Sequence, residues 1–349
     1  MATRRAVLHQ LALGLGVVAC RGAVGQPADG ARYVGIETSA VTGRSRTSFF
    51  SDTGRRLTST ALDFRAHGMA QHGARLIVFP RRPGDRMALL DVTTLEVKSV
   101  TTAPAHRRFC GHGAFSQDGS HLLVTENDLK TLQGHVAVYD ARAGLSRLGS
   151  IALPGPGPHE IIRAPGQNRF LIALGGLETH PDYGRTALNL STFRSQLLAV
   201  DLDTGTVDEW GFWSGTEGVS LRHLAFDATG RLYAGAQVAD AGRAAAENVL
   251  FVVENGQVTR SAAGALLGGY VSSVAAQGST AMVTSKVAHL ALTLDGAQVM
   301  SKTAQVGASA VAMHGDGYGL SGYDALNVVG ATYRALRDHE FDNHAIFVI

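Results

Sequence analysis

The sequence predicts an all-β protein with the architecture of a seven-bladed β-propeller. Short apolar runs rich in β-branched residues recur between Gly, Asp and Asn turns, as at 75–79, 121–125, 169–174 and 249–253. Runs of this length and spacing indicate strands. The pattern repeats about every 45–50 residues with four strands per unit, which is typical of propeller blades. The chain beyond its N-terminal segment then supplies seven blades of about 46 residues each.

The composition fits a folded domain and excludes several other classes of protein. Hydrophobic residues make up 45% of the 349-residue chain and charged residues only 17%, a balance unlike that of disordered chains. The formal net charge is +2, and several of the arginines responsible lie near the N-terminus. The composition of the remaining chain therefore does not indicate a basic surface that binds nucleic acid. Two cysteines, Cys20 and Cys110, do not make a disulfide framework.

Residues 1–25 are expected to be an export signal. A basic start precedes an apolar run at 11–19, which is too short to span a bilayer. The Thr-Arg-Arg-Ala-Val-Leu sequence at 3–8 resembles the twin-arginine export motif. Small residues at 23–25 can form a cleavage site that releases a soluble periplasmic protein, which we favour. The Val-Val-Ala-Cys sequence ending at Cys20 resembles a lipoprotein box, so a lipid anchor through this cysteine is the alternative.

Residues 31–349 are predicted to form a single β-propeller domain. The clearest blade begins at 111, continues through an Asp-Gly turn to a second strand at 121–125, and reaches a third strand at 134–140 that ends in Asp. The chain ends in one isolated strand at 344–349, while its first strands have no inner strand before them. We therefore expect the C-terminal strand to complete the first blade, which closes the ring and leaves no open sheet edge between the first and last blades.

Alignment of the predicted inner strands places a histidine at one equivalent position in five blades. Imidazole is the commonest protein ligand for middle and late transition metals, and a metal needs three or four such groups within about 2.1 Å of one point. Strands around one axis supply that convergence, so we predict an axial iron or copper site. Two alternatives stay open, namely histidines that cap the inner strands and an anion pocket with protonated histidines. The predicted ligands are His67, His112, His159, His223 and His344. The other two blades carry Ser273 and Ala310 at this position.

Further residues are candidates for the surroundings of this site or for the mouth of the channel. His180, Asp182 and Arg185 lie in a long predicted insertion, and functional residues often sit on such loops. Glu126 directly follows a predicted strand and can line the same face or belong to a turn. Cys110 lies two residues from a ring histidine and can be a soft metal ligand or a buried thiol.

Several further motifs stand out along the chain. They are Gly-His-Gly-Ala-Phe-Ser at 111–116, Thr-Glu-Asn-Asp at 125–128, Gly-Pro-His-Glu at 157–160, the 175–185 insertion with Leu-Asn-Leu at 188–190, Leu-Arg-His-Leu at 221–224 and Asp-Asn-His at 342–344. In these motifs the chain from about residue 31 onward resembles one bacterial family, domain of unknown function fifteen-thirteen. The departures are degenerate blades at 268–320, Phe341 in place of a Trp, and Cys110 before Gly-His. The resemblance implies a periplasmic seven-bladed propeller linked to iron-responsive clusters that contain imelysin-like and di-haem oxidoreductase-like proteins. It implies no catalytic residues.

Four functions are compatible with these patterns. The first is a monomeric periplasmic protein that binds iron or copper for iron acquisition or metal homeostasis, with iron-uptake or di-haem proteins as partners. The second is a metal-dependent oxidoreductase or oxygenase, similar in layout to carotenoid-cleaving oxygenases, which hold iron with four axial histidines. The third is a protein-docking propeller with structural histidines. The fourth, a sugar-lactone hydrolase, lacks the acidic clustering expected of a calcium site. Whether the protein is an enzyme stays open.

Overall fold

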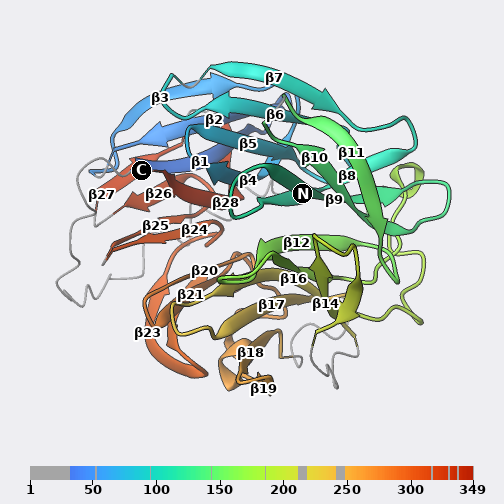
Figure 1. Ribbon diagram of the computed structural model, residues 1–349. Helices are drawn as coiled ribbons and strands as arrows, with labels where there is room; N and C mark the ends of the chain where they lie inside the picture. The colour runs from blue at the N-terminus through green and yellow to red at the C-terminus, as the bar shows by residue number, and fades with distance from the viewer. Residues whose placement is uncertain are drawn as a thin grey trace.

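The computed structural model describes residues 32–348, apart from 52, 95, 143, 185, 211–217, 241–247, 316, 329–330 and 336–337. Within these residues, 28 strands form seven four-stranded antiparallel sheets arranged in a ring (Figure 1). The predicted all-β seven-bladed propeller is confirmed. The expected export signal at 1–25 lies outside the described residues. No helix in the described part of the chain is long and apolar enough to cross a membrane.

The blades are numbered in ring order, with their strands given from the channel outward. The first blade contains β28 (His339–Val348), β1 (Arg32–Ser39), β2 (Ser45–Phe50) and β3 (Arg56–Ala61). The second contains β4 (Ala66–His72), β5 (Arg75–Pro80), β6 (Arg86–Asp91) and β7 (Val97–Thr102). The third contains β8 (Arg107–Phe115), β9 (His121–Asp128), β10 (Gly134–Asp140) and β11 (Ser146–Ala152). The fourth contains β12 (Pro158–Arg163), β13 (Arg169–Leu174), β14 (Gln196–Asp201) and β15 (Val207–Glu209).

The remaining three blades follow the same order. The fifth contains β16 (Val219–Phe226), β17 (Leu232–Val238), β18 (Leu250–Glu254) and β19 (Gln257–Arg260). The sixth contains β20 (Ser273–Gln277), β21 (Thr280–Ser285), β22 (Leu290–Asp295) and β23 (Gln298–Ala304). The seventh contains β24 (Val311–His314), β25 (Gly317–Ser321), β26 (Ala325–Val328) and β27 (Ala331–Arg334). In the described part of the chain, two short 3-10 helices, η1 (Pro181–Tyr183) and η3 (Ala262–Leu267), lie in the connections.

The ring closes through the C-terminal strand, as the sequence predicts. β28 pairs antiparallel with β1 from Arg32 opposite Val348 to Ser39 opposite His339. Figure 1 shows this red strand beside the blue strands β1 and β2. The two ends of the described chain are thus joined by backbone hydrogen bonds within one sheet, so the ring is not left open between the first and last blades.

The hydrophobic core lies between neighbouring blades, because the second and third strands of each sheet bury side chains on both faces. At the first join, Ile36 and Phe49 of the first blade pack with Leu76 of the second. At the last join, Leu326 of the seventh blade packs with Tyr33 of the first. Each fully buried side chain of this size contributes about 1.5–3 kcal/mol. A core at every join holds the inner strands at fixed positions around one axis.

Five inner strands contain a β-bulge, and these are the five that carry the aligned histidines. The register between β4 and β5 shifts between Ala66 and Met69, and corresponding shifts occur at the histidines of β8, β12, β16 and β28. Among the described residues, β20 and β24 pair with their neighbours without a shift. A bulge redirects side chains that regular pleating would send into the blade joins. The bulges therefore distinguish the five histidine-bearing blades from the other two.

A buried hydroxyl ties two of these inner strands together. Thr125 on β9 lies 3.1 Å from the carbonyl oxygen of His112 in its own blade and 2.9 Å from that of His159 in the next blade. The hydroxyl can donate its proton to either carbonyl. It thereby satisfies backbone groups that the bulges remove from regular sheet pairing.

We expect Thr125→Val to destabilise the protein by about 1–3 kcal/mol, because the two buried carbonyls lose their hydroxyl partner while side-chain volume is kept. Urea denaturation followed by circular dichroism measures this change. Thr102→Val, at an exposed position on β7, is the matched control and should leave the free energy of unfolding nearly unchanged. Equal stability of the two variants would contradict the bridging role of Thr125.

Candidate metal centre

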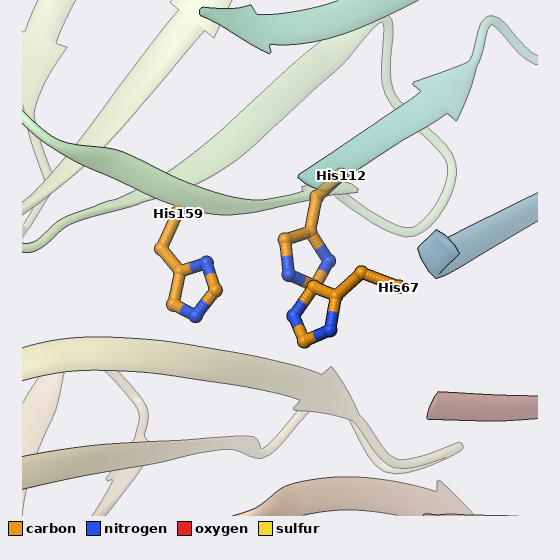
Figure 2. Close-up of side chains that lie close together, drawn as sticks. All are labelled: His67, His112 and His159. Atoms are coloured by element: carbon orange, nitrogen blue, oxygen red, sulfur yellow. The ribbon is translucent and has the colours of Figure 1, made fainter. Parts of the chain in front are cut away.

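The structure brings all five aligned histidine rings together at the channel axis. Successive ring centres are separated by 5.2 Å from His67 to His112, 4.6 Å from His112 to His159 and 5.1 Å from His159 to His223. The circle is completed by 5.0 Å from His223 to His344 and 4.6 Å from His344 to His67. Figure 2 shows His67, His112 and His159 converging from separate strands on one space.

Two overlapping groups of three histidines could hold a metal ion. The first group is His67, His112 and His159, and the second is His112, His223 and His344. Within each group the ligand nitrogens lie within 4.8 Å of one another. A tetrahedral site with metal–nitrogen bonds of about 2.05 Å needs nitrogens about 3.3 Å apart, so small side-chain rotations suffice. The Nε2 atoms of His112 and His344 are buried and have no hydrogen-bond partner among the described residues.

Glycines next to two of the histidines allow the inner strands to approach closely. A Cβ atom at Gly68 would collide with the carbonyl oxygen of Gly111 on the neighbouring inner strand. A Cβ atom at Gly111, whose φ is +105°, would lie only 2.8 Å from Cδ2 of His67. Any larger residue at either position would push the second and third blades apart. The His-Gly and Gly-His pairs of the sequence therefore serve the packing of the ring.

Two carboxylates, the buried Asp342 and the half-buried Glu160, contact the ring, and neither of them is among the site residues predicted from the sequence. Asp342 Oδ1 lies 2.6 Å from Nδ1 of His67. Glu160 Oε2 lies 3.3 Å from Nδ1 of His223, and its Oε1 lies 3.7 Å from Nδ1 of His112. Carboxylates at Nδ1 fix the tautomer and orientation of an imidazole whose Nε2 faces a metal. The sequence offered one indication of these residues, which is their position near aligned histidines. Glu160 directly follows His159, and Asp342 lies two residues before His344.

Burial favours the neutral form of the ring histidines. It lowers the pKa of His112, His159, His223 and His344 well below the usual value, and the charges of neighbouring histidines and of Arg222 act in the same direction on most of them. Burial also raises the pKa of Glu160 to about 8. Neutral imidazoles keep a lone pair available for a metal. At neutral pH these four histidines are therefore ready to act as ligands without first losing a proton.

The insertion after β13 carries two of the other candidate residues. Nδ1 of His180 accepts a hydrogen bond from the backbone N–H of Asp182 at the start of η1, and the Asp182 side chain is largely exposed. His180 lines a narrow cavity together with Cys110 and Arg82. Among the described residues, the imidazole of His180 contacts Tyr183 and none of the five axial histidines. Arg185 lies outside the described residues.

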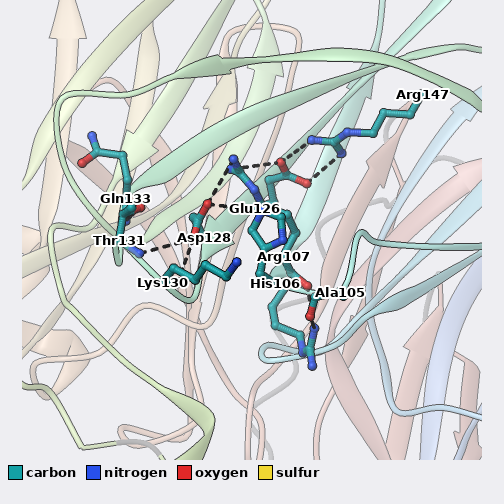
Figure 3. A network of polar contacts seen from close by, with 10 residues as sticks. Ala105, His106, Arg107, Glu126, Asp128, Lys130, Thr131, Gln133 and Arg147 are labelled. Carbon is teal, nitrogen blue, oxygen red and sulfur yellow. Dashed lines mark hydrogen bonds and ion pairs between the residues drawn. The ribbon is translucent and has the colours of Figure 1, made fainter.

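Glu126 belongs to an ion-pair network on the third blade (Figure 3). Its carboxylate receives hydrogen bonds from Nη1 and Nη2 of Arg147 at 2.9 and 2.6 Å, and Arg107 lies 3.4 Å away. Arg107 also pairs with Asp128 at 3.2 Å. The side chain of Glu126 is fully buried, so these arginines balance a charge that would otherwise be costly to bury. Its partners give it a structural role.

Cys110 is buried in the bulge of β8, and neither histidine group includes it. Burial raises the pKa of its thiol to about 12, so the protonated form persists at neutral pH. A metal ligand must be the thiolate. The environment of Cys110 thus fits the second of the two interpretations of this residue, a small buried side chain.

The metal-free protein should lose stability as the pH falls from about 7.5 to about 5.5. Histidines in the unfolded chain take up protons near pH 6.5, whereas the four buried ring histidines resist protonation when folded, so acid favours unfolding. Protonation of the single Glu160, with its raised pKa, acts in the opposite direction and offsets only part of this loss. Urea denaturation across this range measures the effect.

The double variant His112→Gln, His223→Gln should show a shallower pH dependence than the parent protein. His106→Gln, at an exposed position outside the ring, is the matched control. A parent protein whose stability is constant or rises on acidification would contradict the neutral, buried state of the ring.

Solved structures share the fold at low sequence identity. A nidogen/laminin complex structure has a TM-score of 0.56 at 10% identity, covering 92% of this chain and 99% of the other. A functionally unknown protein from Desulfotomaculum acetoxidans has a TM-score of 0.60 at 13% identity, with coverage of 89% and 98%. The WD40 repeats of RRP9 have a TM-score of 0.54 at 12% identity, with coverage of 85% and 92%. These similarities support the fold alone.

The comparison with curated proteins found no match. A family model described as "Protein of unknown function (DUF1513)" matches residues 60–348. This range contains all seven inner strands and every histidine of the ring. Since the match spans most of the sequence, the chain belongs to the DUF1513 family.

Proposed function

We propose that this protein binds a transition metal ion, iron or copper, through the axial histidines and acts in iron acquisition or metal homeostasis. The observation that carries the proposal is the convergence of five imidazoles from five bulged strands. Buried polar atoms are normally hydrogen-bonded, so the partnerless Nε2 atoms of His112 and His344 indicate a ligand at the axis. In this role the metal is cargo held by a rigid scaffold.

The chemistry of the donors selects the class of metal. Each group offers three neutral imidazole nitrogens, which suit iron, copper, nickel and zinc. Calcium and magnesium prefer oxygen ligands and would gain little from such a site. Asp342 and Glu160 contact Nδ1 atoms from outside the ring and would orient the imidazoles around a bound ion.

The proposed location and partners of the protein rest on its N-terminal sequence and its resemblance to the family. The twin-arginine-like residues 1–25 support export to the periplasm, with a lipid anchor at Cys20 as the alternative. We propose a monomer that receives its metal from, or passes it to, periplasmic iron-uptake or di-haem proteins.

A metal-dependent oxidoreductase is the second candidate function. Three histidines leave coordination positions open, which is the arrangement that catalytic metal sites use. A cavity beside the ring is lined by Arg81, Lys286 and Asn343, so it suits a polar co-substrate better than the apolar substrate of a carotenoid-type oxygenase. Oxygen consumption by the loaded protein distinguishes this candidate from simple binding.

The parent protein, exported and purified without a histidine tag, should bind about one equivalent of iron or copper. His112 belongs to both histidine groups, so His112→Ala should lower metal affinity by at least about tenfold. Elemental analysis gives the stoichiometry, and competition with a chromophoric chelator gives the affinity. His314→Ala changes a histidine of inner strand β24 that contacts Phe347 and not the ring, so this variant is the matched control.

Thermal unfolding of the two metal-free variants separates loss of metal from loss of fold. Normal metal content in folded His112→Ala would refute the ring as the binding site. Absence of metal from the parent protein under every loading condition would leave the histidines with a structural role in a protein-docking propeller.

A further inference from the structure

A second site adjoins the histidine ring. A cavity of about 250 Å³ is lined by Arg81 after β5, Lys286 after β21, and Asp342 and Asn343 of β28. Asp342 contacts His67, and Asn343 directly precedes His344, so the wall of the cavity is continuous with the ring. The cavity therefore lies beside the ring, and Asp342 connects it to His67.

The inner part of this cavity carries positive charge. Arg81 is largely buried, and its Nη1 lies 3.4 Å from Oδ2 of Asp342, whose other oxygen contacts His67. The Lys286 ammonium lies 5.1 Å from the centre of the Tyr270 ring, and no carboxylate among the described residues pairs with it. Lys286 is thus a cation available to a ligand.

Hydrogen-bonding groups accompany these charges. Asn343 Nδ2 donates to the hydroxyl of Tyr270 at 3.3 Å, which fixes the amide beside Lys286. Tyr323 and Arg65 also line the cavity, and Glu340 lies at its exposed side. Arginine recognises carboxylate and phosphate through paired N–H groups, whereas lysine supplies a point charge. The combination suits a small oxyanion.

A bound metal makes the charge imbalance larger. A divalent ion together with Arg81 and Lys286 brings four positive charges to this partly buried region. The carboxylates of Asp342 and Glu160 can offset at most two of them. Uncompensated charge away from water is strongly unfavourable. A ligand with negative charge in the cavity would restore the balance and can fill a coordination position that the histidines leave open.

We propose that this cavity binds a small oxyanion, a carboxylate or a phosphate, which balances the charge of the metal at the histidine ring. The inference deepens the proposed function and rests on it for the role of the anion. The lysine and arginine are present without metal, however, so weaker anion binding to the metal-free protein is also expected. Because anion binding is expected both with and without metal, the anion site and the metal site can be tested separately.

Isothermal titration calorimetry on the full-length protein, metal-free and loaded with Co²⁺, tests the proposal with succinate and inorganic phosphate as probes. We expect at least one probe to bind, and to bind about tenfold more tightly to the loaded form because the metal adds charge. Lys286→Gln should weaken binding about tenfold, the effect of losing one charged hydrogen bond. Lys302→Gln, exposed on β23 of the same blade, is the matched control. A change in the visible Co²⁺ spectrum on anion addition would place the anion on the metal.

The outcomes separate the proposals. Binding of succinate alone identifies a carboxylate site, and binding of phosphate alone identifies a phosphate site. Normal Co²⁺ loading without binding of either probe overturns the anion site and leaves the metal proposal intact. Anion binding to a protein that takes up no metal supports the cavity and refutes the metal site. Equal affinity of Lys286→Gln and Lys302→Gln overturns the assignment of the cavity. Lys286→Met keeps the apolar stem over Tyr270 and replaces the glutamine variant if that variant misfolds.

Discussion

The histidine ring depends on closure of the propeller by the pairing of β28 with β1. His344 lies on β28, the last strand of the chain, and His67 lies on β4, the first inner strand in chain order. The centres of their imidazole rings are nevertheless only 4.6 Å apart. Only a closed ring of seven blades brings these strands to one axis. The apolar cores between successive blades then hold all five histidine-bearing strands in place. Rigidity of this kind lets a site form without ordering any loop when a ligand arrives.

Gathering five buried or half-buried imidazoles around one point has a free-energy cost. Each histidine buries polar nitrogens, and two Nε2 atoms find no partner among the described residues. Apolar side chains at these positions would pack without that penalty. The ring of histidines also requires five β-bulges and two tightly packed glycines. Such departures from regular pairing concentrate at functional sites, which is the physical basis of the proposal that the ring binds a ligand.

The sequence predicted the blades well because strand period, turns and the isolated C-terminal strand are local patterns. The equivalence of the five histidines also emerged from alignment of the inner strands. The bulges did not, since they depend on how two strands pair and leave no fixed residue signature. Asp342 and Glu160 were missed for the same reason, because only a redirected backbone turns residues one or two positions from a histidine toward the ring. Glu126, a candidate for the surroundings of the site, forms ion pairs with Arg107 and Arg147 that local sequence does not reveal.

The central claim is that several imidazoles of this ring bind one metal ion directly. X-ray absorption spectroscopy of the metal-loaded protein counts imidazole ligands through the multiple scattering of their rings. The account predicts at least three imidazole nitrogens at about 2.0–2.1 Å from the metal. A spectrum that contains only oxygen neighbours, or a single imidazole, would contradict it.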